Sequence, residues 1–445
     1  MAINKKFYEY DMRDDFSIPV YVGYDLIKCG KIEGVNPQRR VAGQLIRKSG
    51  QTYLELADFP RKKGYESSET GIVYDEEDKI ANHNDGGTWY ACTWDGTLQF
   101  IIRKYFRVKY TEHFATNHFT NSTSRWLVTD YSITSQLMLP IKVSSMELSL
   151  DYVYAWFNIF HPEQDRTKNK PLIFKNLTFE NQNFMLVVVA NRKEKHELHE
   201  FQKTAYMSIK VIFKNEQTRD FTYQLAVTIR NFFQILTGKS IGISRIILNS
   251  NIQQDPNKQG MLLKDERENW FLDQSFLPDK VNEKNLTFDV PYRDISANFE
   301  YILKQYLIDA KLQQFISNFL IIDQFRIPVN TQIVTLISAV ESYYNEAKYS
   351  NGKPIQSAIN KLQRLGELIE DPNDFLKKNS IHGRATDISS LFQEMIDARD
   401  YIVHGVKIKK YTSEADLFPD LIIFKKLIQT AIIRIVLIQI ESNNE

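Results

Sequence analysis

The residues best suited to chemistry stand in one short run, Arg399-Asp400-Tyr401-Ile402-Val403-His404-Gly405. A guanidinium can hold a phosphate through parallel N–H groups, and a histidine, with an ordinary pKa of about 6.5, can exchange protons at neutral pH. Together they suit acid–base chemistry at a phosphate. The spacing alone is weak, because a chain with eight histidines should match such a loose pattern by chance about once.

The sequence around Arg399 gives this run a physical context. Arg399 follows Ile396 along an otherwise apolar stripe of a predicted helix, so its charge needs a partner. Asp400 precedes His404 by four residues, a spacing that could orient the imidazole and favour its protonated form. Gly405 is expected to end the helix as its C′ residue, which would let the ring of His404 reach outward.

A basic cluster follows directly and is suited to binding phosphates: Lys407, Lys409 and Lys410. No comparable signal exists for a metal or a cofactor. His196 and His199 form the only close histidine pair at helical spacing, but no third ligand is evident beside them. The sequence also lacks a glycine-rich phosphate loop and a nucleophile elbow. We therefore expect neither a metal nor a cofactor.

A second predicted helix carries a matching feature. Glu341 shares one face with Val334 and Ile337, so a carboxylate interrupts an apolar stripe and is the natural partner for Arg399. The residues leave two interpretations open at this point. Glu341 and Arg399 either belong to an active site or form a buried ion pair with a structural role only, in which case His404 is an ordinary histidine favoured by the helix dipole.

Composition limits the classes of protein that fit. The chain has 445 residues, enough for two or three domains that each bury a core. Lys+Arg 56 against Asp+Glu 55 leaves a net charge of +1, so any site for a polyanion must be local. Two cysteines and the absence of a signal-peptide pattern favour a reducing compartment, the cytoplasm. The apolar run 421–440 carries charges through its body and is predicted to be a buried helix, not a membrane span.

The first part of the chain has the pattern of β structure. Residues 40–190 hold short β-type runs separated by turn residues, among them a hairpin around Ser49-Gly50 and a predicted strand over 146–157. A helix is predicted over 221–236, closed by Thr237-Gly238. These elements favour an antiparallel sandwich or barrel with one helix packed on it.

The pattern changes to helical periods after a polar stretch over 249–285. Helices are predicted over roughly 295–325, 330–347, 354–368, 387–403 and 416–440. The expected fold class is therefore α+β multidomain: a β-rich antiparallel region over residues 1–290, followed by an all-α helical bundle over residues 291–445.

The helical region resembles a HEPN domain. Ribonucleases of that family carry Arg, a polar residue, three to five further residues and then His, often followed by Gly. Arg399, Asp400, His404 and Gly405 fit this pattern in the penultimate long helix. The predicted helix with Glu341 resembles the earlier helix that places an acidic residue near the active Arg. The resemblance implies that Arg399 and His404 are catalytic and that Asp400 and Glu341 support them.

The N-terminal region resembles the ApeA-type domain that precedes HEPN domains in bacterial anti-phage proteins. The resemblance rests on Arg40-Val41-Ala42-Gly43-Gln44-Leu45 with Gly50, on Tyr53-Leu54-Glu55-Leu56, and on the later strands over 89–110. No catalytic signature accompanies these residues. The resemblance therefore implies an architecture and a sensing or regulatory role for residues 1–290.

Together the resemblances imply a metal-independent RNA endonuclease that acts in anti-phage defence by abortive infection. HEPN ribonucleases cleave RNA by attack of its own 2′-hydroxyl on the adjacent phosphate. His404 would exchange protons, Arg399 would hold the phosphate, and Lys407, Lys409 and Lys410 would supply affinity for the RNA backbone. The implied partners are RNA, with tRNA among the candidates, and a phage-derived trigger.

Geometry adds an expectation about assembly. Five residues along a helix turn side chains about 140° apart, so Arg399 and His404 do not point at one atom. A two-fold pairing of chains would bring both types of residue to one groove, in keeping with the dimers of the HEPN family, so a homodimer is expected. Two alternatives stay open: a non-catalytic HEPN module that binds RNA or a protein, and a ligand-binding β-sandwich with a helical dimerisation tail.

Overall fold

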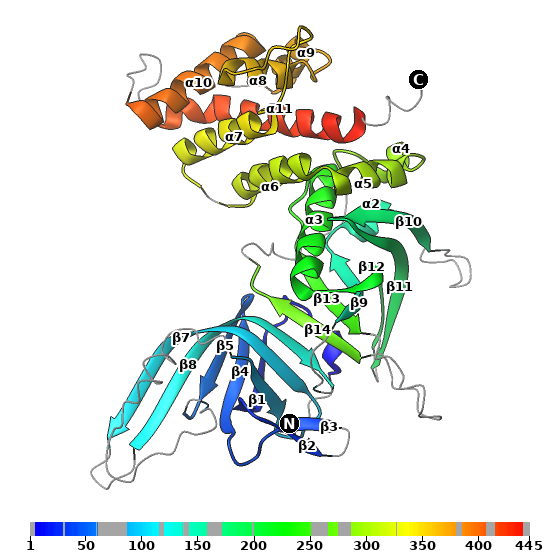
Figure 1. The fold of residues 1–445 in the computed structure, drawn as a ribbon, viewed down its shortest axis with the longest axis vertical. Coiled ribbons are helices and arrows are strands. Elements are labelled where there is room, and N and C mark those ends of the chain that lie inside the picture. Colours follow the sequence, from blue (N-terminus) through cyan, green and yellow to red (C-terminus); the bar gives the residue numbers. More distant parts are fainter. Residues whose placement is uncertain are drawn as a thin grey trace.

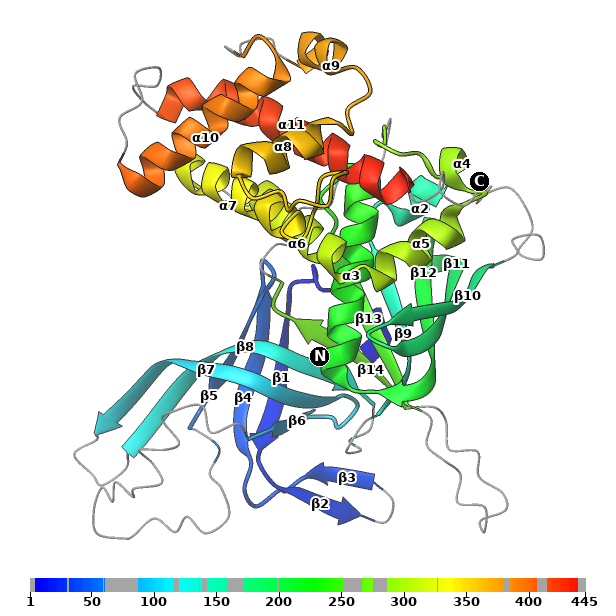
Figure 2. The same ribbon diagram turned by 45° about the horizontal axis from the view of Figure 1, so that its top comes forward.

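The computed structural model shows a β-rich region followed by a helical region (Figures 1 and 2). It describes residues 5–29, 32–58, 60, 87–114, 120–135, 137, 142–157, 171–197, 200–250, 266–274, 286–325, 327–379, 385–405 and 414–438. The order of antiparallel strands followed by helices confirms the expected α+β fold class.

Six antiparallel strands of the first region close into a barrel in the order β8-β5-β4-β1-β6-β7, with β7 paired to β8. The strands are β1 (Phe16–Gly23), β4 (Val41–Lys48), β5 (Gln51–Leu56), β6 (Trp89–Thr93), β7 (Gln99–Phe114) and β8 (Thr120–Thr134). The predicted hairpin is confirmed, since β4 and β5 pair across a turn in which Ser49 and Gly50 have positive φ. Along β5 every second residue is buried, as expected of a strand with one face to the barrel core.

The sheet continues beyond the barrel because β8 also pairs with β14, which leads into the order β14-β13-β9-β12-β11-β10. These strands are β9 (Val143–Leu150), β10 (Leu172–Phe179), β11 (Gln182–Glu197), β12 (Glu200–Gln217), β13 (Ile243–Ser250) and β14 (Glu266–Leu272). A small hairpin, β2 (Leu26–Cys29) with β3 (Ile32–Val35), stands apart from this sheet. Helix α3 (Arg219–Thr237) packs against β9 and ends at Gly238 with φ +64°, which confirms the predicted helix and its closing glycine.

A buried ionic network ties the barrel, the second part of the sheet and α3 together. Glu268 on β14 accepts from the Nη2 of Arg103 on β7 at 3.1 Å and pairs with Arg219, the first residue of α3. Asp130 on β8 accepts from the indole N–H of Trp270 on β14 at 2.8 Å. Because burial lowers the pKa of Arg219 while the carboxylate of Glu268 opposes the shift, the pairing is what keeps this charge in the interior.

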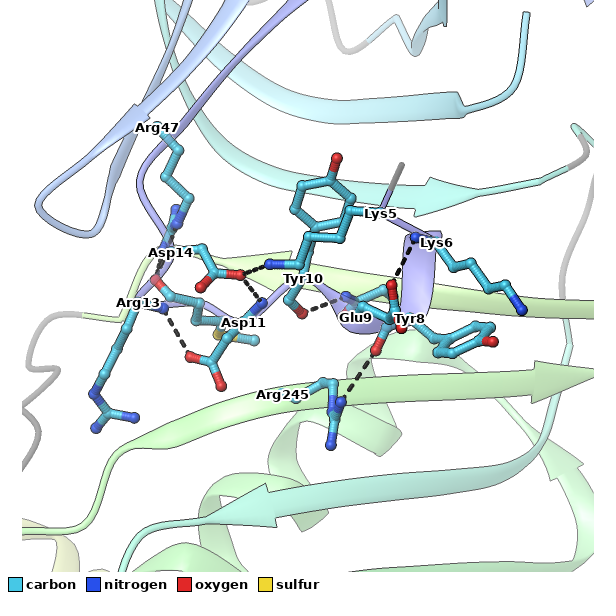
Figure 3. Close-up of polar contacts among 12 residues, drawn as sticks. Lys5, Lys6, Tyr8, Glu9, Tyr10, Asp11, Arg13, Asp14, Arg47 and Arg245 are labelled. Carbon is cyan, nitrogen blue, oxygen red and sulfur yellow. Dashed lines mark hydrogen bonds and ion pairs between the residues drawn. The ribbon is translucent and has the colours of Figure 1, made fainter. Parts of the chain in front are cut away.

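The N-terminal segment, residues 5–15, lies across the junction between the barrel and β13 (Figure 3). Arg47 of the barrel donates from Nε to the carbonyl of Met12 at 3.0 Å, and Arg245 of β13 donates to the carbonyl of Tyr8 at 3.1 Å. The segment includes the short helix η1 (Phe7–Glu9). Backbone carbonyls of one segment therefore connect two parts of the β region.

The helical region is built around α7, which contacts α6, α8, α10 and α11. Its helices are α4 (Tyr292–Ile295), α5 (Phe299–Ile308), α6 (Ala310–Gln324), α7 (Val329–Tyr343), α8 (Ala358–Gly366), α9 (Pro372–Asn379), α10 (Ile388–His404) and α11 (Glu414–Ile438). Buried side chains of α11 include Leu421, Phe424 and Leu427, which confirms the prediction of a buried helix there. In the described part of the chain no helix is long and apolar enough to span a membrane.

Two predicted elements differ from the structure. The strand expected over 146–157 ends at Leu150, because the chain turns at Tyr152 with φ +60° and continues as helix α2 (Val153–Phe157). The single helix expected over 295–325 is divided among α4, α5 and α6. Asp309 causes the second break, since its side chain accepts from the N–H of Leu312 at 2.9 Å and so begins α6 as an N-cap.

The two regions share one continuous cluster of buried apolar residues. The indole N–H of Trp156 on α2 donates to the carbonyl of Val290 at 2.7 Å, and the ring of Phe299 on α5 packs against Phe174 on β10 with centroids 5.0 Å apart. Asp289 accepts from the side chain of Gln429 on α11 at 2.8 Å. A division into separate domains at residue 290 stays a prediction, and the contact between the regions is extensive.

Candidate active site

Helix α10 carries most of the candidate residues and has strong signals at both ends. Asp387 is the N-cap, and its Oδ1 accepts from the N–H of Ser390 at 2.8 Å. At the other end Gly405 has φ +71° and donates its N–H to the carbonyl of Tyr401 at 2.9 Å. The helix therefore begins and ends within one residue of the predicted bounds, 387–403, and its last residue is His404.

Arg399 projects from α10 toward α7 and meets the carboxylate expected there. Its Nη1 lies 3.6 Å from Oε2 of Glu341, and the side chains are 23% and 30% exposed. Its Nε lies 3.0 Å from Oδ1 of Asp400, but the N–H is not directed at the carboxylate, so this contact is an ion pair without a hydrogen bond. The expected partnership of Arg399 with Glu341 is confirmed as a contact between helices.

His404 is exposed at the end of α10, one turn beyond Asp400. Among the described residues, no hydrogen bond or ion pair joins the two side chains. The supporting role expected for Asp400, to orient His404 or the RNA, therefore stays a prediction. Asp400 instead faces Arg399, whose guanidinium carries a permanent charge.

Lys361 on α8 is a neighbour that the sequence analysis missed. Its side chain is almost wholly buried, at 6% exposure, and its ammonium donates to the carbonyl of Glu341 at 3.0 Å. A buried cation at the C-terminal end of α7 complements the carbonyls there. The sequence could have indicated its burial. Lys361 follows Ala358 by three residues and precedes Leu365 by four, which places it on the apolar stripe of α8.

The end of α10 also exposes apolar side chains. Tyr401 and Val403 on α10, and Phe418 and Ile422 near the start of α11, are each about half exposed. The two helices pack against each other and are joined through residues 405–413, so both pairs lie toward the same end of the helical region (Figure 1). Tyr401 and Val403, two positions apart, do not share one face of α10, whereas Phe418 and Ile422, four apart, share one face of α11.

Two other expectations concern this part of the chain. Lys407, Lys409 and Lys410 lie outside the described residues. Within the described residues, no group of three or more His, Cys, Asp or Glu side chains is arranged to hold a metal ion. What the structure places together is therefore Arg399, Glu341 and Asp400 in contact, Lys361 behind Glu341, and His404 exposed beyond them.

Comparison with protein families gives one match. The family ApeA N-terminal domain 1 matches residues 107–306, which run from β7 through the second part of the sheet and α3 into α5. No curated protein and no solved structure matches the chain. The matched range begins after most of the residues on which the ApeA resemblance rested, so the similarity is carried chiefly by the later strands and α3. The match supports an ApeA-type protein.

Proposed function

We propose that the chain is a metal-independent RNA endonuclease that acts in anti-phage defence by abortive infection, with its active site in a HEPN domain over residues 291–445. The observation that carries the proposal is the placement of Arg399 between two carboxylates on the helix that ends in exposed His404 and a left-handed Gly405. This is the arrangement that the HEPN motif implies. The family match over residues 107–306 supports the defence role.

The residues can perform cleavage by transfer within the RNA. The 2′-hydroxyl oxygen forms a bond to the adjacent phosphorus, the bond to the 5′-oxygen of the next nucleotide breaks, and a cyclic phosphate and a 5′-hydroxyl result. His404 would take the proton from the 2′-hydroxyl or deliver one to the leaving oxygen. Arg399 would stabilise the charge that gathers on the phosphate oxygens. In the described part of the chain its ion pairs use Nη1 and Nε, and Nη2 is the donor that would bind the phosphate.

The proposed enzyme is a homodimer. Arg399 is directed at α7 while His404 lies exposed at the helix end, so one chain offers the two groups in different directions. The exposed apolar side chains near the ends of α10 and α11 supply a surface that a second copy can cover. A two-fold contact there would bring the two helix ends together in one composite groove.

One observation favours a second candidate, a non-catalytic module that binds RNA or a protein. Arg399 is only partly exposed and is paired with both Glu341 and Asp400, as expected of a structural ion pair. In that case Arg399 would hold α10 on α7 and His404 would have no role in chemistry. The two candidates differ sharply in what substitution of His404 does.

The deciding experiment is cleavage of total cellular RNA by the purified full chain, with a chelator present. The proposal expects products from the wild type and none from His404→Ala, with equal melting temperatures. Lys378→Ala is the matched control, because Lys378 is an exposed cation in the last turn of α9. If the wild type is silent in vitro, expression during phage infection should be toxic only with His404 intact. Toxicity that survives His404→Ala would contradict the nuclease.

A further inference from the structure

A second site lies on the barrel, far from α10. A hollow of about 700 Å³ is found where β4 begins and β5 ends. Its described lining follows the strand order, from Pro19 on β1 across β4 and β5 to Arg125 on β8 and Lys109 on β7. Figure 1 places the barrel and α10 at opposite ends of the molecule, so the hollow is separate from the candidate active site. Its volume lies within the range of about 300–1,000 Å³ that is usual for ligand sites.

An exposed indole stands at the β1 edge of this hollow. Trp94 follows β6 and is 62% exposed, the largest exposed fraction among the large apolar side chains of the described residues. Its ring stacks on Tyr21 with centroids 5.9 Å apart and an angle of 25°, and the guanidinium of Arg40 lies 3.9 Å from the centroid of Tyr21. The indole is therefore held in place by a neighbour while most of its surface stays open. Such a ring is a platform on which a flat group can stack.

Cations stand at the opposite edge. Lys109 and Arg125 both line the hollow, and Glu55 is the only carboxylate among its described lining residues. Oε1 of Glu55 lies 3.4 Å from Nε of Arg125, and both side chains are about half exposed. The carboxylate is thus compensated within the hollow, and Lys109 leaves an excess of one positive charge. No ion pair to Lys109 is recorded in the described part of the chain.

The positive charge continues along β7. From Lys104 to Thr111 the strand carries three cations and no carboxylate, with Tyr105 and Phe106 after the first cation and Tyr110 after the last. Lys104 and Arg107 are exposed, as are the apolar neighbours Phe106 and Val108. Residues 105–110 of β7 pair with a part of β8 that also pairs with β5, so they belong to the barrel wall, and β7 and β8 extend together beyond it in Figure 2. A basic strand interleaved with aromatic side chains, next to an open indole, is the pattern that single-stranded nucleic acid requires.

We propose that the hollow and the adjoining part of β7 bind a short single-stranded segment of nucleic acid. One base stacks on Trp94, and the phosphates that follow lie against Lys109 and Arg125. The hydroxyls of Thr111 and Thr123, which also line the hollow, donate to phosphate or sugar oxygens. The site selects single strands over duplexes and binds their charge, with little preference for base sequence, because every base has a face that can stack.

The chemistry of the lining favours a nucleic acid over an acidic peptide. A peptide carboxylate would use Lys109 but would leave the open face of Trp94 without a flat partner. A nucleotide can stack its base on the indole and place its phosphate at the cation at once, because the sugar joins the base to the phosphate. A duplex is also disfavoured, since its bases are already stacked on one another and offer no free face to the indole.

The test is a binding titration of the full chain carrying His404→Ala, so that a bound RNA strand stays intact whether or not the chain is a nuclease. Short labelled single strands of RNA and of DNA are followed by fluorescence anisotropy over a series of salt concentrations. Trp94→Ala should weaken binding about tenfold, the effect of one lost base stack, and Trp94→Phe should restore most of the affinity. Lys109→Ala should reduce the salt slope by about 0.7, the contribution of one phosphate contact.

Matched controls are an exposed aromatic residue on α3 and an exposed lysine on β12, tested as Tyr223→Ala and Lys214→Ala. Both controls should bind as the parent chain does. Equal affinity of the parent, Trp94→Ala and Lys109→Ala would overturn the proposal, as would no binding of either strand. A duplex or a polyglutamate peptide that binds in preference to the single strand, with the same dependence on Trp94, would also overturn it. None of these results depends on the catalytic role proposed for His404.

Discussion

The guanidinium of Arg399 lies 3.6 Å from the carboxylate of Glu341, and this contact joins α10 to α7. Lys361 approaches the backbone of Glu341 from α8, so three helices meet at one acidic residue. Because the ion pair is partly exposed, its contribution to the free energy of unfolding should be small, about 0–1 kcal/mol. Its main effect is on the direction in which the guanidinium points.

The first prediction concerns Glu341, whose contact with Arg399 should affect the direction of the guanidinium more than the free energy of unfolding. Glu341→Gln keeps the size of the side chain and removes its charge, so Arg399 loses its anchor while the packing of α7 stays intact. Under the proposed function, cleavage should fall about ten- to a hundredfold because the guanidinium proposed to bind the phosphate is misplaced, and the melting temperature should change little. The measurement is the rate of RNA cleavage together with a thermal melt.

Glu367→Gln is the matched control for this prediction. Glu367, the residue that directly follows α8, pairs with Arg364 of that helix, and both side chains are more than half exposed, so its loss should leave cleavage unchanged. Equal rates for the wild type and Glu341→Gln, with no change of fold, would remove Glu341 from the site. If Glu341→Gln lowers the melting temperature but leaves the cleavage rate of the folded protein unchanged, the ion pair of Glu341 with Arg399 has a structural role only.

A second prediction concerns the barrel wall. Gly43 on β4 pairs with Leu56 on β5, and a Cβ built at Gly43 would lie 2.3 Å from the carbonyl oxygen of Glu55 and 2.5 Å from a methyl group of Leu56. A backbone oxygen within a ladder cannot move aside. Gly43→Ala should therefore lower the free energy of unfolding by about 1–3 kcal/mol, seen as a lower denaturation midpoint.

The control for the barrel prediction is Gly34→Ala. Gly34 lies in strand β3, and a Cβ built there meets nothing within 4 Å. Both substitutions add the same atom and remove the same conformational freedom from the unfolded chain. Gly43→Ala should consequently be clearly less stable than Gly34→Ala. Equal midpoints for the two variants would show that β4 and β5 can separate locally at Gly43.

The sequence predicted the ends of α10 well because local interactions set them. The side chain of Asp387 caps the first turn, and Gly405 adopts the left-handed backbone after the last turn without steric cost. The partnership of Glu341 with Arg399 was also predictable. Each charge interrupts an apolar stripe, and two such charges on adjacent helices stabilise each other only in contact.

Other features depend on contacts that local patterns do not reveal. Strand β8 pairs with β5, β7 and β14, so closure of the barrel is decided by segments far apart in the sequence. From the sequence alone, Asp309 could continue a helix or cap one. In the structure it is the N-cap of α6. Asp400 has Arg399 and His404 within reach along one helix, and spacing alone does not choose between them.

A third prediction concerns the thiol of Cys92 on β6. Burial raises the pKa of this thiol, and Arg40 beside it lowers the pKa in part. In a Cys29→Ser background, alkylation of Cys92 should therefore rise with pH only above the usual thiol pKa of about 8.5. Adding Arg40→Ala should move the midpoint to still higher pH. Mass spectrometry of the alkylated protein over a pH series measures both midpoints.

The same pKa shift has a consequence for stability. A thiol with a higher pKa in the folded state binds its proton more tightly there than in the unfolded chain. The free energy of unfolding should accordingly fall as pH rises from the unfolded pKa of about 8.5 through the folded value. Cys92→Ala should remove this part of the pH dependence. A midpoint at or below the usual thiol pKa would contradict both statements.

The last prediction concerns the composite site. Chains carrying Arg399→Ala and chains carrying His404→Ala should each form inactive dimers. A mixed dimer with one chain of each kind retains one intact Arg399 and one intact His404, on opposite chains. If a site takes these two groups from different chains, the mixed dimer regains one of two sites, so its activity should exceed that of either parent dimer and fall short of the wild type.

The mixed species can be isolated by co-expression with two different tags and sequential affinity purification, with light scattering to establish that it is a dimer. Two wild-type chains with the same tags give the reference rate, which allows for any effect of the tags. If Arg399 and His404 of one chain act together instead, no site in the mixed dimer is complete and its activity should equal that of the parents. A wild-type monomer with full activity would rule out a composite groove altogether, because every group needed for cleavage would then come from one chain.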